Sequence, residues 1–365
     1  MKNVTMISRR SFLKAAMAAS AVSALAFTGC GGSASSTVAA SSTASSAAAS
    51  AATEGGQTFK VGIVNYVDHA SLNQIVESVE SRLDKLGAEK GVTFDYADYY
   101  ANAQADQSNL NQIGADLVGD GVDVIVAVAT PTAATMLAAV EDTDIPVVYS
   151  AVTAPAAAGF DGEENITGTS DALNTEAIMN LITAVNPDID TIGLLYDLSQ
   201  DASTQAIADA KAFCDANGIK YIEKNGTTTA EVQMAAEALI AAGVKAVFTP
   251  TDNTVMTAEL SIYETFTEAG VQHYTGADSF ALNGAFVGYG VDYVQLGEAT
   301  ADMVAELLCE GKTTADLPYQ TFDNGIVTIN TETCEALGLD LDTVKKAFKP
   351  YCTEIVEVTT AENFS

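Results

Sequence analysis

Hydroxyl, carboxylate and amide side chains recur directly after short apolar runs of this 365-residue chain. Thr130 and Thr132 follow the run 122–129, and Asp252 and Asn253 follow the run 246–249. Backbone N–H groups and hydroxyls at the start of a helix are suited to a carboxylate, whereas an aspartate is suited to an ammonium group. Facing each other, the two sets have the chemistry to hold a small zwitterion such as an amino acid.

Motifs for covalent or metal chemistry are missing from the sequence. It has no GxSxG elbow, no P-loop and no GxGxxG after a predicted strand. Its two His residues have no matching Cys or metal-ligand spacing, which leaves little general-base or metal chemistry. We therefore predict no enzyme, no catalytic residue, no metal and no cofactor. An enzyme on an exported flavodoxin-like fold is the alternative, and turnover of a substrate by the pure protein would reveal it.

The polar positions are carried by alternating apolar runs and amphipathic segments, the rhythm of βαβ units. In the first series, strands are expected at 60–67, 92–100, 122–129 and 146–152, with helices at 72–86 and 110–118 and another starting near Pro131. After a polar, turn-rich stretch at 159–170, the second series has strands at 191–196, 220–223, 246–249 and 273–277. The pattern predicts an α/β fold with two doubly wound parallel-sheet lobes joined by a multi-crossover hinge.

The later segments are predicted to cross between the lobes. A strand at 286–291 and a helix at 293–309 return to the first lobe, and 319–329 crosses back. The expected division is lobe 1 at 58–168 plus 289–318 and lobe 2 at 169–288 plus 319–365, with 1–29 and 30–57 set apart. The hinge is expected near 168–171, 290–292 and 317–319. Ligand binding should close the two lobes about it.

The N-terminus has the features of an export signal, since basic residues precede an uncharged run at 15–28. The segment 8–14 (SRRSFLK) resembles a twin-arginine signal, and 27–30 (FTGC) resembles a bacterial lipobox. We expect residues 1–29 to be an export and lipoprotein signal, Cys30 to be lipidated, and 30–57 to be a Ser/Ala-rich disordered tether. The protein would then be extracytoplasmic and lipid-anchored to the cell membrane. The alternative is an ordinary cleaved signal with an incidental Cys.

Charge limits the partners. The chain has 48 acidic and 16 basic residues and a formal net charge of -32, which excludes the clustered Lys and Arg that nucleic-acid binding requires. The same balance argues against a peripheral electrostatic hold on anionic lipid. Beyond the N-terminus no apolar run is long enough for a membrane span.

Five short segments together resemble a known family. They are Asn102 to Ser108, Ala129 to Ala133, Asn165 to Asp171, Pro250 to Thr254, and Gly290 to Tyr293 with Leu296 and Gly297. In order and spacing the chain from about Lys60 to Leu341 resembles the substrate-binding lipoproteins of ABC importers of the tryptophan/tyrosine type, with the type I periplasmic-binding-protein fold. The resemblance implies an ABC permease and its ATPase subunits as partners. In one departure, the chain has Thr153-Ala154-Pro155 where the family often has Thr-Asp-Pro.

In open parallel sheets, ligands lie beyond the carboxyl ends of the strands. We therefore predict the following ligand-binding set: Tyr66, Asp68, Tyr100, Asn102, Thr130, Thr132, Thr153, Ser170, Asp252, Asn253 and Asp278. The ligand carboxylate is expected near Thr130 and Thr132, and its ammonium at Asp252 or, failing that, Asp278. Tyr66 with Tyr99 or Tyr100 would flank an aromatic side chain; adjacent strand residues face opposite ways, and Tyr100 is preferred.

Several of these residues have a purely structural alternative. Asp68 could be the N-cap of the helix that follows it, and Asp252 or Asn253 could cap theirs. His69 has no other histidine near it in the sequence, which is more typical of a surface or capping group than of a catalyst. Cys334 and Cys352 could form a disulfide outside the membrane or remain free thiols.

The sequence favours an amino acid as the solute, and an aromatic one first. Two functional alternatives of the binding class remain. One is a receptor that passes its signal to a membrane sensor instead of a permease. The other is a binding protein for a sugar or a nucleoside, although the chain has no Trp for the stacking platform that sugars often use.

Overall fold

The computed structural model describes residues 56–322 and 325–363. The predicted signal, Cys30 and nearly all of the predicted tether lie outside these residues. Within the described ranges, no helix combines the length and the apolar character needed to cross a membrane.

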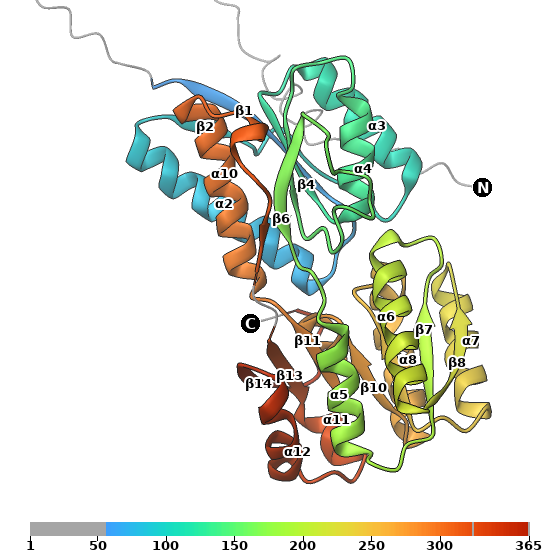
Figure 1. Cartoon of the computed structure of the whole chain (residues 1–365). Coiled ribbons are helices and arrows are strands. Elements are labelled where there is room, and N and C mark those ends of the chain that lie inside the picture. Colours follow the sequence, from blue (N-terminus) through green and yellow to red (C-terminus); the bar gives the residue numbers. More distant parts are fainter. Residues whose placement is uncertain (1–55, 323–324, 364–365) are drawn as a thin grey trace, which may run out of the picture. The chain divides into compact units, whose positions relative to one another are not determined.

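The first lobe is built on a seven-stranded sheet (Figure 1). Its strands are β1 (Thr58–Asn65), β2 (Thr93–Asp95), β3 (Tyr100–Asn102), β4 (Val124–Val128), β5 (Val147–Ser150), β6 (Ile166–Ser170) and β12 (Gln320–Thr321). Their order is β12-β6-β5-β4-β1-β2, with β3 also paired to β1, and each pair is parallel. The helices of this lobe are α2 (Ala70–Lys90), α3 (Gln107–Asp120), α4 (Thr130–Ala139) and α10 (Tyr293–Glu310), and η1 (Thr314–Asp316) precedes β12. Because β1, β4 and β5 are almost wholly buried, their runs are apolar on both faces.

Two details of the first lobe differ from the sequence prediction. The single strand expected at 92–100 is two short strands, because β2 pairs with the start of β1 and β3 with its end. The turn-rich stretch at 159–170 contains β6, which is fully buried although it holds three hydroxyl residues. Its hydroxyls have partners, since Thr167 donates to the Leu317 carbonyl and Thr169 bonds to Thr300. A polar strand is tolerated in a core when its hydrogen bonds are made.

Helix α10 joins the first lobe from far along the chain and packs along α2, beside which Figure 1 draws it. Gly297 permits the close approach, because a Cβ there would lie 2.7 Å from the Ile75 carbonyl oxygen. On the outer side, Arg82 pairs with Asp302 at 2.8 Å and Lys90 with Glu310 at 2.8 Å. Exposed pairs of this kind contribute little each, so the packing holds the helix and the charges align it.

The second lobe contains another seven-stranded sheet, ordered β14-β13-β11-β10-β9-β7-β8. Its strands are β7 (Thr191–Tyr196), β8 (Lys220–Asn225), β9 (Ala246–Thr249), β10 (Gln272–Thr275), β11 (Val287–Gly290), β13 (Ile326–Asn330) and β14 (Glu354–Val358). The pairs are parallel except β11 with β13. The helices are α5 (Thr175–Val185), α6 (Asp201–Asn217), α7 (Thr229–Ala241), α8 (Asn253–Glu268), α9 (Asp278–Leu282), α11 (Thr331–Ala336) and α12 (Leu341–Phe348), followed by η2 (Lys349–Tyr351).

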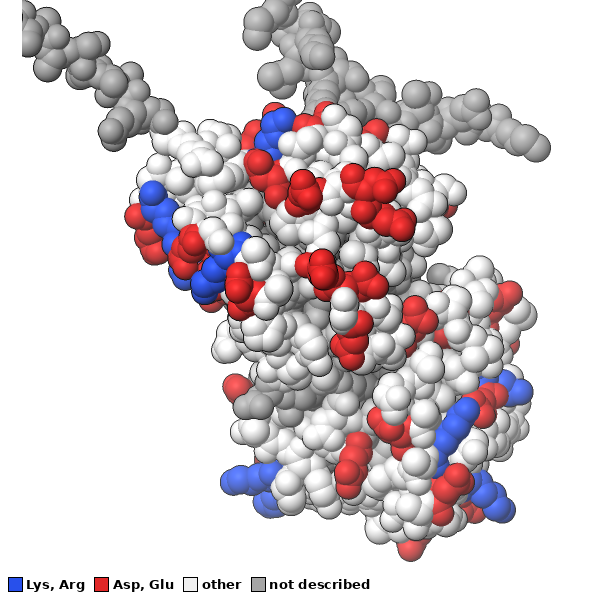
Figure 2. Space-filling model, turned by 45° about the horizontal axis from the view of Figure 1, so that its top comes forward, with Lys and Arg blue, Asp and Glu red and all other residues white. Residues whose placement is uncertain are grey.

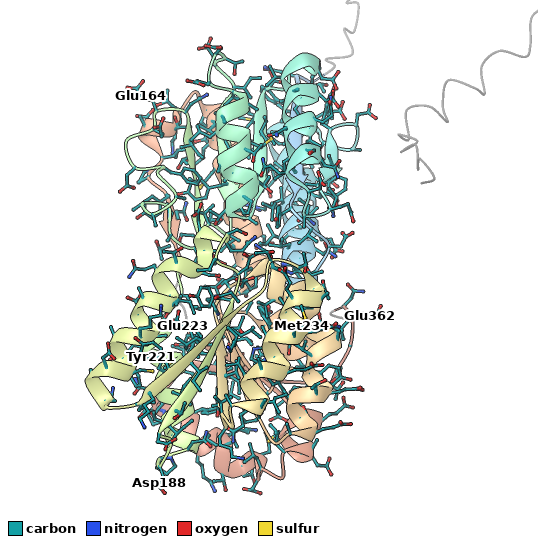
Figure 3. All side chains as sticks on the ribbon, turned by 90° about the vertical axis from the view of Figure 1, so that its right-hand side faces the viewer. Glu164, Asp188, Tyr221, Glu223, Met234 and Glu362 are labelled. Carbon is teal, nitrogen blue, oxygen red and sulfur yellow. The ribbon has the colours of Figure 1, made fainter. Side chains whose placement is uncertain are left out.

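Strand β8 is an outer edge of the second sheet, and Figure 3 labels Tyr221 and Glu223 on it. Glu223 accepts a hydrogen bond from the Tyr196 hydroxyl and pairs with Lys211 at 2.6 Å. Charged side chains on an exposed edge discourage pairing with another chain. On the face drawn in Figure 2, acidic side chains outnumber basic ones, in keeping with the net charge of -32.

The chain passes between the two sheets three times. It leaves the first sheet after β6, returns after β11 to begin α10, and leaves again after β12. Two α/β lobes with largely parallel sheets and several crossovers are what the sequence predicted, and this fold class is confirmed. The four described cysteines are free, so Cys334 and Cys352 form no disulfide. Their thiols donate instead to the carbonyls of Leu339 and Phe348.

Candidate functional site

The carboxyl ends of the strands of both sheets face a small cavity between the lobes. The cavity encloses about 20 Å³ and is lined by residues of both lobes. That volume suits one water-sized sphere and is too small for an amino acid. The structure is therefore a closed conformation, and binding of any larger solute requires the two walls to separate.

The first wall contains the start of α4. The N-cap residue of this helix is Ala129, which has no side-chain oxygen, and Pro131 follows in the first turn. The first N–H groups of a helix have no partner inside it, so the missing cap leaves donors at this end. The Thr130 hydroxyl lines the cavity, is buried and has no hydrogen-bond partner among the described residues. Together these groups are hydrogen-bond donors that the described residues leave without a side-chain partner.

Backbone strain marks the same wall. Ala129 has φ of 78° and Ala151 has φ of 57°, and both residues line the cavity directly after β4 and β5. Residues other than glycine adopt such values at a cost of about 1–3 kcal/mol each, and they concentrate at functional sites. The strain therefore agrees with the unpartnered hydroxyl in pointing to this edge of the sheet.

The second wall contains the start of α8, which is capped. Asp252 Oδ1 accepts the backbone N–H groups of Thr254 and Val255, both at 3.0 Å. Its Oδ2 accepts the Asp197 backbone N–H and the Ser203 hydroxyl, both at 2.7 Å. Burial raises the pKa of Asp252 to about 6. The carboxylate lines the cavity, but each of its oxygens already has two donors.

Two hydrogen bonds join the walls across the cleft. His69 Nε2 lies 3.1 Å from the Asn253 side-chain oxygen, and the Ser71 hydroxyl donates to Asp278 at 2.8 Å. His69 is the N-cap of α2, where its Nδ1 accepts the Leu72 N–H, so the Nε2–H is the donor to Asn253. Burial lowers the pKa of His69 to about 4, which keeps the ring neutral.

A carboxylate and two apolar side chains complete the lining. Asp171 follows β6, is 3% exposed and accepts from the Thr153 hydroxyl at 2.9 Å. Met256 on α8 and Phe280 on α9 supply apolar surface from the second lobe. The cavity lining thus combines the uncapped start of α4, the carboxylates of Asp171 and Asp252, and apolar side chains. Among the described residues no group of three or more His, Cys, Asp or Glu is arranged to hold a metal ion.

The structure brings Thr130, Thr153, Asp252 and Asn253 of the predicted set to the cavity lining. Asp278 is not in the lining but accepts a hydrogen bond from Ser71, a lining residue of the opposite lobe. Thr132 and Ser170 are buried and lie within two residues of the lining residues Thr130 and Asp171 in the sequence. The remaining four are Tyr66, which is buried outside the lining, Tyr100, which is 41% exposed, and Asp68 and Asn102, which bond to each other at 2.8 Å.

The structural alternative for Asp68, a cap on α2, is wrong, because α2 begins at Ala70 and His69 occupies the N-cap position. The structural alternative for Asp252, a cap on its own helix, is present, and so is the capping role of His69. Sequence reasoning did not select Asp171, although it ends one of the five family segments. Phe280 gave no signal at all, since α9 has only five residues and no periodicity to detect.

Comparisons with known proteins agree with this arrangement. The family model of the ABC transporter substrate binding protein matches residues 60–348. The chain belongs to this family. Its members are binding proteins rather than enzymes, and they are extracytoplasmic parts of ABC transport systems. The resemblance inferred from the five segments is confirmed.

Individual relatives extend the comparison. The chain is 28% identical over 294 residues to a tyrosine-binding protein of Clostridioides difficile, covering 79% of this chain and 83% of that one. The structure of an ABC domain from Streptococcus pneumonia in complex with L-Trp matches with a TM-score of 0.73 and 26% identity, over 82% of this chain and all of that one. The ligand-free, open structure of a Clostridium difficile substrate-binding protein with adhesive properties matches with a TM-score of 0.61 and 28% identity, over 83% of this chain and all of that one. The higher score belongs to the ligand complex, in keeping with a closed cleft here.

Proposed function

We propose that this family member is a lipoprotein that binds a zwitterionic amino acid, best an aromatic one, and delivers it to the permease of an ABC importer. The relatives named for tyrosine and crystallised with L-Trp support the solute class. Of the predicted ligand set, Thr130, Thr153 and Asn253, which line the cavity, are part of this proposal, with the ligand carboxylate near Thr130 and Thr132.

The observation that carries it is the uncapped start of α4 beside an unpartnered hydroxyl. Thr130 Oγ1 is a buried polar atom without a partner among the described residues, as is Thr132 Oγ1 in the same turn, whereas the hydroxyls of Ser71 and Thr153 are bonded. An unpaired buried hydroxyl costs free energy unless a ligand supplies the missing bond. A carboxylate would satisfy both the hydroxyl and the exposed N–H groups of the first turn.

Calorimetric titration tests this function. The wild-type protein should bind tryptophan, tyrosine or phenylalanine and should not bind ribose or a nucleoside. Thr130→Val should weaken binding about tenfold by removing one charge-assisted hydrogen bond, while leaving the fold intact. Thr135→Val is the matched control, because Thr135 lies on the same helix outside the lining and bonds to Pro131. Binding of ribose or a nucleoside alone would contradict the proposal.

The anchor is the second part of the proposal and rests on the sequence at Cys30. If Cys30 carries the lipid, the mature protein partitions with membranes and Cys30→Ser leaves it soluble or unprocessed. A mature N-terminus mapped to another residue, or one without acyl chains, would contradict this part and leave the solute assignment intact.

A further inference from the structure

Asp171 occupies the first passage of the chain between the lobes, directly after β6. Its Oδ1 accepts the hydroxyl of Thr153, and its Oδ2 lies 3.4 Å from the hydroxyl of Tyr293. Tyr293 is the first residue of α10, where the chain has just returned from the second lobe. One carboxylate therefore links two crossovers and also faces the cavity.

The charge of Asp171 has no compensation. None of the ion pairs among the described residues includes it, and the residues lining the cavity contain no Lys or Arg. Its side-chain donors are two neutral hydroxyls, and burial raises its pKa. A buried carboxylate without a cation is unfavourable, and its oxygens have room for more than one donor each.

Asp252 also has no ion pair among the described residues, but it differs from Asp171 in its donors. Its four donors occupy both oxygens, and two of them come from Asp197 and Ser203 of its own lobe. An ammonium group would have to displace some of these bonds. At Asp171 it would add to two existing bonds and supply the missing positive charge.

We infer that Asp171, rather than Asp252, receives the ammonium group of the ligand, and that Tyr293 positions this carboxylate at the hinge. The inference rests on the proposed function, since it assigns the second end of the same zwitterion. The carboxylate of the ligand would lie at α4 and its ammonium at the crossover, so the ligand spans from the first wall to the hinge. Occupancy of the cleft would thereby act on the segments about which the lobes move.

The test compares amino acids with analogues that lack only the amino group. Tryptophan and indole-3-propionate, or tyrosine and its deamino analogue, are titrated into wild type, Asp171→Asn, Asp252→Asn and Tyr293→Phe. Asp171→Asn should lose about 100-fold in affinity for the amino acid and change little for the analogue. Asp252→Asn should keep the wild-type ratio between the two ligands. Tyr293→Phe should lower that ratio less than Asp171→Asn does.

The pH dependence gives a readout that does not require Asp171→Asn to fold. Ammonium binding needs ionised Asp171, so amino-acid affinity should fall as pH decreases through its raised pKa, whereas the analogue should keep its affinity. Asp252→Asn should retain this difference. A pH dependence that vanishes in Asp252→Asn, or an unchanged ratio in folded Asp171→Asn, would overturn the inference alone. Wild type that binds none of the amino acids would overturn the proposed function and this inference with it.

Discussion

The two walls of the cleft differ in how the first N–H groups of a helix are bonded. Each presents the start of a helix after a parallel strand, α4 in the first lobe and α8 in the second. Asp252 caps helix α8 with two of its four hydrogen bonds, whereas α4 begins at strained Ala129 with no side-chain cap.

The capped start of α8 contributes to the stability of the protein, whereas the uncapped start of α4 has donors that a ligand can use. A capped helix start is complete in itself and forms a rigid wall, while an uncapped one keeps its donors for another molecule. The bonds from His69 to Asn253 and from Ser71 to Asp278 join the two walls in the closed state. In the proposed function, polar recognition belongs to the first wall and the hinge, and closure uses one partner from each wall.

The largest expected effect is on stability at the second wall. Asp252→Ala removes four hydrogen bonds and leaves buried donors unpaired, which should lower the free energy of unfolding by about 3–5 kcal/mol. Asp252→Asn keeps the cap and should cost less. Urea unfolding measures both variants, with Thr130→Val as the comparison at the first wall. Equal losses in Asp252→Ala and Thr130→Val would break the distinction between the walls.

A smaller effect concerns pH, and it has opposite signs at the two walls. Burial raises the folded pKa of Asp278 from 3.8 to about 6, so its stabilising contribution is present below pH 4 and is lost as pH rises to 6. His69 has a folded pKa of about 4, below 6.5, so its contribution is present above pH 6.5 and is lost as pH falls to 4.

Each of these two contributions is about 3 kcal/mol, because each pKa differs from its ordinary value by a little more than two units. Unfolding free energies measured between pH 4 and 7 should therefore change slope in opposite directions in Asp278→Asn and His69→Asn. Identical slopes in both variants and wild type would show that neither group changes its environment on folding.

The smallest expected effect concerns the strain at Ala129. Glycine adopts positive φ without a Cβ clash, so Ala129→Gly should raise the free energy of unfolding by about 0.5–1 kcal/mol after its larger unfolded-state entropy is offset, which thermal unfolding measures. Ala133→Gly, inside α4, is the matched control and should destabilise the protein by a similar amount. A loss of stability in both variants would remove the argument that the first wall stores strain.

Local pattern was enough for much of the fold. The strands 191–196 and 246–249 were predicted with the bounds that β7 and β9 have, because a run that is buried on both faces is apolar throughout. Strand β6 was missed because its residues are polar, and its burial depends on Thr300 and Leu317, which lie about 130 to 150 residues away.

The sequence was enough to predict the kind of binding site and the edge of the sheets where it lies, but only some of its residues. Strand ends and helix starts are visible in the sequence, so Thr130, Thr153, Asp252 and Asn253 could be named. Tyr100 could not be placed, because the break between β2 and β3 sets which way it faces.

By itself the sequence determined the family, the two-lobed α/β architecture and the edge where polar groups collect, since these follow from periodicity and from residue order. Only the tertiary structure decided which carboxylate is free to bind. Asp252 obtains two of its four donors from residues 49 and 55 positions away, and Asp171 obtains one from Tyr293, 122 positions away. Both carboxylates are buried, so the number of hydrogen-bond donors that each receives from neighbours in space distinguishes the structural carboxylate from the one available to a ligand.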